Sequence, residues 1–89
     1  MTAYNCPVEM VSLCSLTGEL TPVRFRCEEA DHTVCVFRVS EVISTREISH
    51  VGAEAMIFLC RADAENREHL MELKYSYRTH RWVLFRMIH

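Results

Sequence analysis

Glycine and proline are scarce in this sequence, with two of each among 89 residues. The chain therefore has no Gly-rich loop that could cradle a phosphate, and it has little material for flexible linkers. It also lacks an HExxH pattern, a Ser-containing nucleophile elbow and a carboxylate pair expected to converge. These absences argue against the common nucleotide-binding and hydrolytic classes, so we expect a protein that is not an enzyme and uses no cofactor.

Long apolar runs are also missing. No run approaches the ~20 residues that a membrane helix needs. The first 16 residues carry no basic segment ahead of an apolar stretch, and Glu9 interrupts that stretch, so a secretory signal is not expected. The sequence predicts a cytoplasmic protein without membrane contacts. Its formal net charge of -2 disfavours nucleic acid as a partner.

The five cysteines are odd in number and contain no CxxC spacing, which fits neither a complete disulfide framework nor a zinc ribbon. A zinc site formed by Cys27, Cys35, Cys60 and His69 is an alternative, but their spacing matches no zinc motif. We therefore expect reduced, buried thiols and no metal site.

The length and composition predict one domain spanning residues 1–89, because a shorter unit would bury too little surface to be stable. Within it, the N-terminal segment 1–17 is structurally undetermined. Periodicity does not decide whether residues 8–16 form a strand or a short helix.

Alternation of apolar and polar residues is the main structural signal, and it predicts strands. The segment TPVRFRCE (21–28) alternates strictly, and a Val-rich strand follows from residue 33. A hairpin centred on Asp31 places Cys27 opposite Cys35, Phe25 opposite Phe37 and Arg24 opposite Arg38.

Further strands are predicted at 55–60, 67–77 and 82–88. For 67–77, a helix beginning at an Asp63 cap is the alternative. A turn around residues 78–81 would place Tyr75 opposite Phe85 and Leu73 opposite Met87. Segment 40–54 has room for an extension of the preceding strand and a loop.

Consecutive strands with short turns predict an all-β fold, a small antiparallel meander of about five strands that curls into an SH3-like, partly open barrel. The expected core consists of Val23, Phe25, Phe37, Val39, Met56, Phe58, Met71, Leu73, Tyr75 and Phe85.

The outer face of this predicted sheet carries more apolar residues than a solvated face should. We therefore expect a homodimer, or another homo-oligomer. Its predicted interface consists of Val36, Ile57, Leu59, Trp82, Leu84 and Ile88. The alternative is that segment 8–16, or a helix at 63–73, covers this face within one chain.

Three arginines, Arg24, Arg26 and Arg38, fall on the wet face of the predicted hairpin. Arg24 opposite Arg38 is repulsive, and a bound anion would offset that repulsion. Together with a stacking surface from Trp82 or a tyrosine, they could form a weak site for single-stranded nucleic acid. The alternative is that these side chains are solvated or paired with glutamates such as Glu41, Glu47 or Glu72.

The order of GELTPVRFR (18–26), CVFRV (35–39) and ELKYSYRTHRWVL (72–84) resembles a family of short uncharacterised bacterial proteins. The resemblance spans most of residues 18–86 and implies a bacterial, stand-alone, β-rich protein, and no function accompanies it. The expected function is thus a small non-catalytic accessory or protein-interaction module that self-associates, and the alternative is an anion or single-strand binder.

Overall fold

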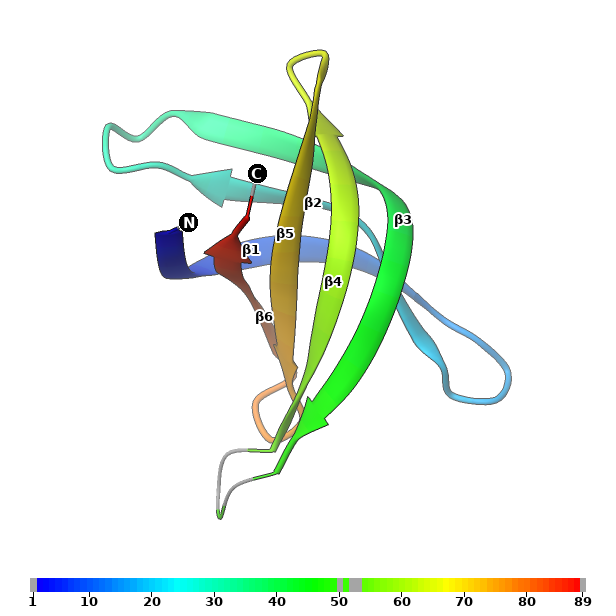
Figure 1. The fold of residues 1–89 in the computed structure, drawn as a ribbon. Helices are drawn as coiled ribbons and strands as arrows, with labels where there is room; N and C mark the ends of the chain where they lie inside the picture. Colours follow the sequence, from blue (N-terminus) through cyan, green and yellow to red (C-terminus); the bar gives the residue numbers. More distant parts are fainter. Residues whose placement is uncertain (1, 50, 52–53, 89) are drawn as a thin grey trace.

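The computed structural model describes residues 2–49, 51 and 54–88, and all of its regular elements are β-strands. Each strand pairs antiparallel with the next along the chain, and the first also pairs with the last, which closes the sheet into a barrel (Figure 1). The predicted all-β antiparallel barrel is confirmed, with six strands instead of about five and with closure instead of a partly open edge. The strands are β1 (Thr2–Cys14), β2 (Leu20–Glu28), β3 (Val34–Ile48), β4 (Ala55–Ala64), β5 (Arg67–Ser76) and β6 (Arg81–Met87).

The sixth strand is β1, which comes from the N-terminal segment that the sequence left undetermined. Its first half pairs with β6 and its second half with β2. The ladder is irregular between Ala3 and Cys6, where Asn5 has a positive φ of 45°, and again between Val11 and Ser12. Such irregularities bend a strand, so one segment of 13 residues can cross from one neighbour to the other and close the barrel.

The hairpin between β2 and β3 has the predicted register, with Phe25 opposite Phe37 and Cys27 opposite Cys35. The two phenyl rings stack with centroids 4.9 Å apart. At the turn, the Glu29 amide donates to the Thr33 carbonyl at 2.8 Å, so the loop is centred on Asp31 as predicted. The polar and apolar alternation on both strands therefore fixed the pairing without a strong turn dipeptide.

The turn between β4 and β5 consists of Glu65 and Asn66, which both adopt positive φ angles, of 53° and 61°. Two central residues of this kind form the tight hairpin turn that matches the twist of paired strands. The predicted strand at 67–77 is confirmed as β5, and the helix beginning at Asp63 is wrong.

The predicted pairing of β5 with β6 is wrong. Tyr75 lies opposite Trp82 and Leu73 opposite Leu84, because the turn occupies residues 77–80 and the His80 amide donates to the Ser76 carbonyl at 2.8 Å. This register differs from the predicted one by three residues, and an odd shift exchanges the two faces of a strand. Trp82 and Leu84 therefore point into the barrel, and Phe85 does not.

The barrel interior is filled by inward-facing residues of β2 to β6, and partly buried residues of β1 pack against them. Most of the predicted core is present, including Phe25, Phe37, Phe58, Met71 and Leu73. The buried cluster consists of Phe25, Cys27, Phe37, Phe58, Cys60, Ala62, Ala64, Met71, Leu73, Trp82 and Leu84.

On the outer face, long basic side chains lie beside apolar residues of β4 and β6. Ile57 lies on this face between Arg46 and Lys74 of the neighbouring strands, and only 1% of its surface is exposed. Phe85 lies beneath the Lys74 ammonium and the Arg86 guanidinium, 5.3 and 5.2 Å from the ring centroid. Long basic side chains can bury apolar surface while their charges stay in water. No helix of the described residues is long and apolar enough to cross a membrane.

Candidate functional site: a groove between β2 and β3

The barrel wall opens where β2 and β3 separate. The two strands are paired only from Arg24 to Glu28 and from Val34 to Arg38. Beyond Arg38, β3 pairs with β4 as far as Ile48, and the first residues of β2 pair with β1. Figure 1 shows β3 bending away from β2 to follow β4. Among the described pairings, the two edges that face each other across this opening have no ladder partner.

A groove of about 770 Å³ occupies the opening, within the size range of pockets that hold small molecules or peptide side chains. It is lined by the β1–β2 turn with the strand ends beside it, by β3, β4 and β5, and by the first residue of the β5–β6 turn. The lining residues are Cys14, Gly18, Glu19, Leu20, Thr21, Val42, Ser44, Thr45, Met56, Phe58, Tyr75 and Tyr77.

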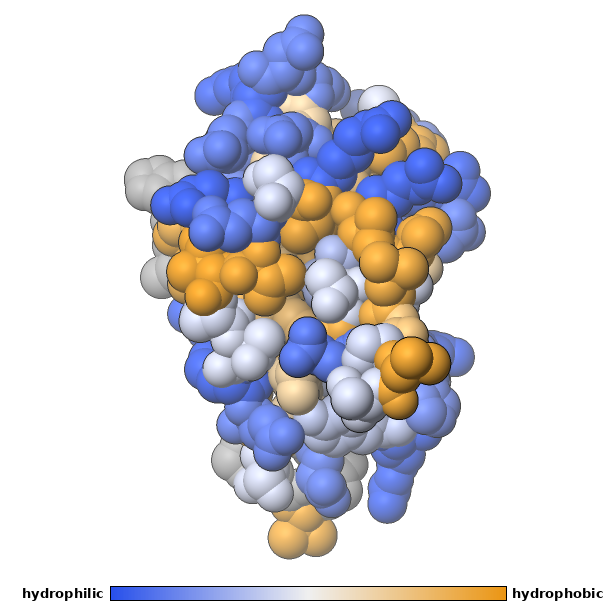
Figure 2. Space-filling model, turned by 90° about the vertical axis from the view of Figure 1, so that its right-hand side faces the viewer, coloured by the Kyte–Doolittle hydropathy of each residue, from blue (hydrophilic) through white to orange (hydrophobic). Residues whose placement is uncertain are grey.

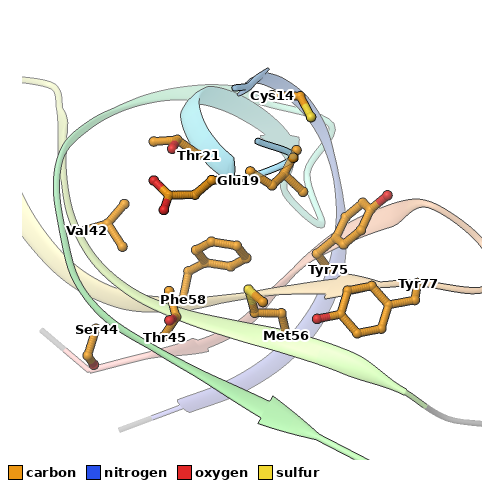
Figure 3. A pocket seen from close by; sticks show the side chains of 12 residues that line it. Cys14, Glu19, Thr21, Val42, Ser44, Thr45, Met56, Phe58, Tyr75 and Tyr77 are labelled. Atoms are coloured by element: carbon orange, nitrogen blue, oxygen red, sulfur yellow. The ribbon is translucent and has the colours of Figure 1, made fainter. Parts of the chain in front are cut away.

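Side chains from these elements converge on one space (Figure 3). Val42 enters from β3, Phe58 and Met56 form the floor on β4, and Tyr75 lies on the opposite side. On the side of the molecule where β3 and the β1–β2 turn lie, apolar side chains gather in a band between hydrophilic ones (Figure 2). An apolar floor with a few polar groups is typical of a binding site.

The floor is rigid because it continues into the aromatic core. Trp82 lies beneath it, with its ring centroid 5.2 Å from that of Phe58 and 5.1 Å from that of Tyr75. Tyr77 meets Tyr75 edge to face at 5.9 Å. The Tyr75 hydroxyl is hydrogen-bonded to His80 Nδ1 at 2.8 Å. These contacts fix the orientation of the rings that a ligand would meet.

Glu19 brings a carboxylate into the groove. The β1–β2 turn holds its backbone, since the Ser15 amide donates to the Glu19 carbonyl at 2.9 Å and the Glu19 amide donates to Ser15 Oγ at 3.0 Å. Gly18 completes the turn with a φ of +87°, a conformation that glycine adopts without strain. Figure 3 shows the carboxylate between Thr21 and Phe58, pointing into the groove.

Tyr77 stands at the rim beside two glutamates. Its hydroxyl donates to Glu47 Oε1 at 3.4 Å. The pKa of Tyr77 is raised, first by desolvation and then by the negative charges of Glu47 and Glu54. The rim therefore has a negative potential, which favours cations over anions.

The structure brings Arg24, Arg26 and Arg38 together on the outer face, around a shallow hollow that Glu9 and Val36 also line. Glu9 from β1 pairs with Arg26, with Nε and Oε1 3.0 Å apart, and Arg24 lies opposite Arg38 as predicted. Trp82 is buried in the core, so it does not provide a stacking surface beside these arginines. Anion binding here stays a prediction that rests on the arginines alone.

The six predicted interface residues do not form one exposed patch. Trp82 and Leu84 lie in the core because of the shifted β5–β6 register, and Ile57 is covered by its neighbours, so their expected exposure is wrong. Leu59 and Ile88 are half-buried, and Val36 alone of the six is exposed. The β5–β6 register and the neighbours of Ile57 thus bury three of the six residues that suggested a homodimer. Self-association stays a prediction.

The zinc alternative gains no support, since no group of three or more metal-ligating side chains suited to a metal ion occurs in the described part of the chain. Cys27 and Cys35 face each other as free thiols. Burial, followed by the nearby Cys6 and Cys35, raises the pKa of Cys27 to about 11, and burial raises that of Cys60 to about 12. Thiols with such pKa values are poor nucleophiles at neutral pH.

The cysteines of the folded protein should therefore react with iodoacetamide at different rates. We expect Cys14, which is exposed, to react quickly at pH 8, and Cys27 and Cys60 to react only after unfolding. At that pH their thiolate fractions are about 10⁻³ and 10⁻⁴, before burial restricts access further. Peptide mass mapping against time measures this, with the protein in urea as the control. Rapid labelling of Cys60 in the folded state would contradict the closed barrel.

Family models, curated proteins and solved structures all gave no match to this chain. The resemblance to a bacterial family stays a prediction. The geometry of the groove is therefore the basis on which a function can be inferred.

The groove was not predicted from the sequence, although its lining residues Met56, Phe58 and Tyr75 were expected in the core. Glu19, Thr45 and Tyr77 lie far apart in the chain, and Thr45 falls in the segment 40–54 that gave little signal. One signal was available: segment 40–54 has room to extend the preceding strand, and in the structure β3 has 15 residues and β2 has 9, so part of β3 continues without β2.

Proposed function

We propose that this protein is a non-catalytic binding module that takes an extended segment of a partner protein in the groove between β2 and β3. The observation that supports this is the opening itself. Among the described residues, the edge of β3 that faces β2 has no strand partner beyond Arg38. An unpaired strand edge beside an apolar pocket suits strand addition, in which main-chain hydrogen bonds give affinity and the pocket gives specificity.

The chemistry of the lining also favours binding over catalysis. The described lining contains one thiol, that of Cys14, and no histidine that could activate it or a hydroxyl. His80 is nearby, but its Nδ1 is hydrogen-bonded to the Tyr75 hydroxyl. A nucleophile needs a base within hydrogen-bond reach. The groove instead offers aromatic and aliphatic surface with polar groups at its border.

Selection from a phage-displayed library of random heptapeptides tests this proposal. We expect enriched peptides to bind the protein and to slow the alkylation of Cys14, which lines the groove. Thr45→Trp should weaken the binding of these peptides by about tenfold or more, because Thr45 faces inward opposite Phe58 and a larger side chain fills the groove. Fluorescence polarisation of the labelled peptides measures both affinities.

Thr79→Trp is the matched control. Thr79 is exposed in the β5–β6 turn and does not line the groove, so this substitution should leave peptide binding unchanged. Circular dichroism checks that both variants keep their strand content. Enriched peptides that bind wild type and Thr45→Trp equally, and leave Cys14 reactive, would contradict the proposal.

A further inference from the structure

The charge in the groove is negative. The described lining of the groove includes the carboxylate of Glu19 and no arginine, lysine or histidine. Among the described residues no basic group lies within ion-pair distance of Glu19, in contrast to Glu9, Glu41 and Glu72, which are all paired with arginines. A carboxylate without a basic partner beside apolar surface favours a cation that enters the groove.

An aromatic ring near Glu19 suits the same kind of ligand. Phe58, beside the carboxylate, is only 1% exposed, but the half-buried Tyr75 lies across the space from it (Figure 3). The face of an aromatic ring attracts a cation, and the attraction increases where the cation is partly desolvated. Tyr75 is held by contacts with Trp82 and His80, so its ring does not need to reorganise when a ligand enters.

The rim extends the negative potential. Glu47 accepts the hydrogen bond from the Tyr77 hydroxyl, and Glu54 is close enough to act on the same phenol. Arg46, which neighbours Glu47 in sequence, lies on the outer face, where it pairs with Glu72 at 3.4 Å. The nearest guanidinium along β3 is thus bound away from the groove, and the acidic rim is left to a ligand.

We infer that the groove recognises a lysine or arginine side chain of an extended segment, with its cationic group between the Glu19 carboxylate and the ring of Tyr75. This inference rests on the proposed function, because the same strand addition along β3 would deliver the side chain. Charge complementarity identifies the ligand class: the described lining offers the Glu19 carboxylate and an aromatic ring, and it has no basic group that would pair with an acidic side chain.

Four labelled heptapeptides test the inference. They share a host of alternating valine and threonine and differ at the central position, which is lysine, arginine, methionine or glutamate. We expect the lysine or arginine peptide to bind about tenfold more tightly than the methionine peptide, with the glutamate peptide weakest. The preference should fall as salt is raised from low to high concentration, since part of it is electrostatic. Fluorescence polarisation gives the four affinities.

Glu19→Gln keeps the shape of the side chain and removes its charge. It should reduce the preference for the basic peptides to about threefold or less while leaving the affinity of the methionine peptide unchanged. Glu65→Gln, in the β4–β5 turn and outside the groove, is the matched control and should keep the full preference.

The outcomes separate this inference from the proposed function. If the four peptides bind alike and Thr45→Trp blocks them all, the groove binds extended segments but does not select a cation, and the inference fails alone. If Glu19→Gln still prefers the basic peptides, Glu19 is not the group that selects the cation, and the inference is wrong. If none of the four binds while library-selected peptides occupy the groove, the cationic specificity is overturned and the binding module stands.

Discussion

Replacing Trp82 with alanine should lower the free energy of unfolding by about 3–5 kcal/mol, the usual cost of removing a large buried aromatic side chain. Trp82 is 7% exposed and contacts Phe58 and Tyr75, so its loss leaves a cavity beneath the floor of the groove. A domain of this size has a total stability near the lower end of about 5–15 kcal/mol. Trp82→Ala therefore takes the protein close to complete unfolding. Urea denaturation followed by far-UV circular dichroism measures the change.

Leu84→Ala provides a milder version of the same test. Leu84 is 3% exposed, and its truncation should cost about 2–5 kcal/mol. The matched control is Leu16→Ala in the β1–β2 turn, where the side chain is fully exposed and the expected change is within about 0.5 kcal/mol. Phe85→Ala should cost less than Leu84→Ala, because Phe85 is half-buried on the outer face beneath Lys74 and Arg86. The opposite order would support the register predicted from the sequence.

Leu84 and Phe85 show how far the fold could be predicted from the sequence. The β2–β3 pairing was predictable because strict alternation on both strands leaves one register that matches apolar with apolar, as for Phe25 and Phe37. On β6, WVLFRMI is apolar at nearly every position, so both faces satisfy the pattern. The turn geometry at Tyr77–His80, with a positive φ of 58° at His80, decides the register instead. Its sequence contains no glycine that would have indicated this turn.

The predicted homodimer followed from that same ambiguity. With Trp82 and Leu84 assigned outward, the outer face carried more apolar surface than a monomer exposes. The structure places both inside and shelters Ile57 under Arg46 and Lys74. Alternation alone cannot reveal this cover, because the basic residues belong to neighbouring strands whose registers had to be known first. The candidate site was missed for a related reason, since it forms where β2 and β3 stop pairing.

Glu72 on the outer face is the residue whose charge should matter most for stability. Its side chain is 11% exposed, and its two carboxylate oxygens contact different arginines: Oε1 lies 2.9 Å from Arg86 Nε and Oε2 lies 3.4 Å from Arg46 Nη2. The contact with Arg86 is an ion pair that does not have the alignment of a hydrogen bond. One buried carboxylate thus holds together β3, β5 and β6.

Glu72→Lys should cost about 3 kcal/mol of unfolding free energy, because it places a third positive charge between two arginines in a poorly solvated position. Glu72→Gln should cost less, about 1–2 kcal/mol, since the arginines are partly exposed and can turn toward water. Glu68→Lys, on the same strand with an exposed carboxylate, is the control and should change stability by no more than about 1 kcal/mol. Added salt should recover part of the loss in Glu72→Lys by screening the repulsion. Urea denaturation at two salt concentrations measures these differences, and equal stability of Glu72→Lys and Glu68→Lys would show that the two arginines do not depend on this carboxylate.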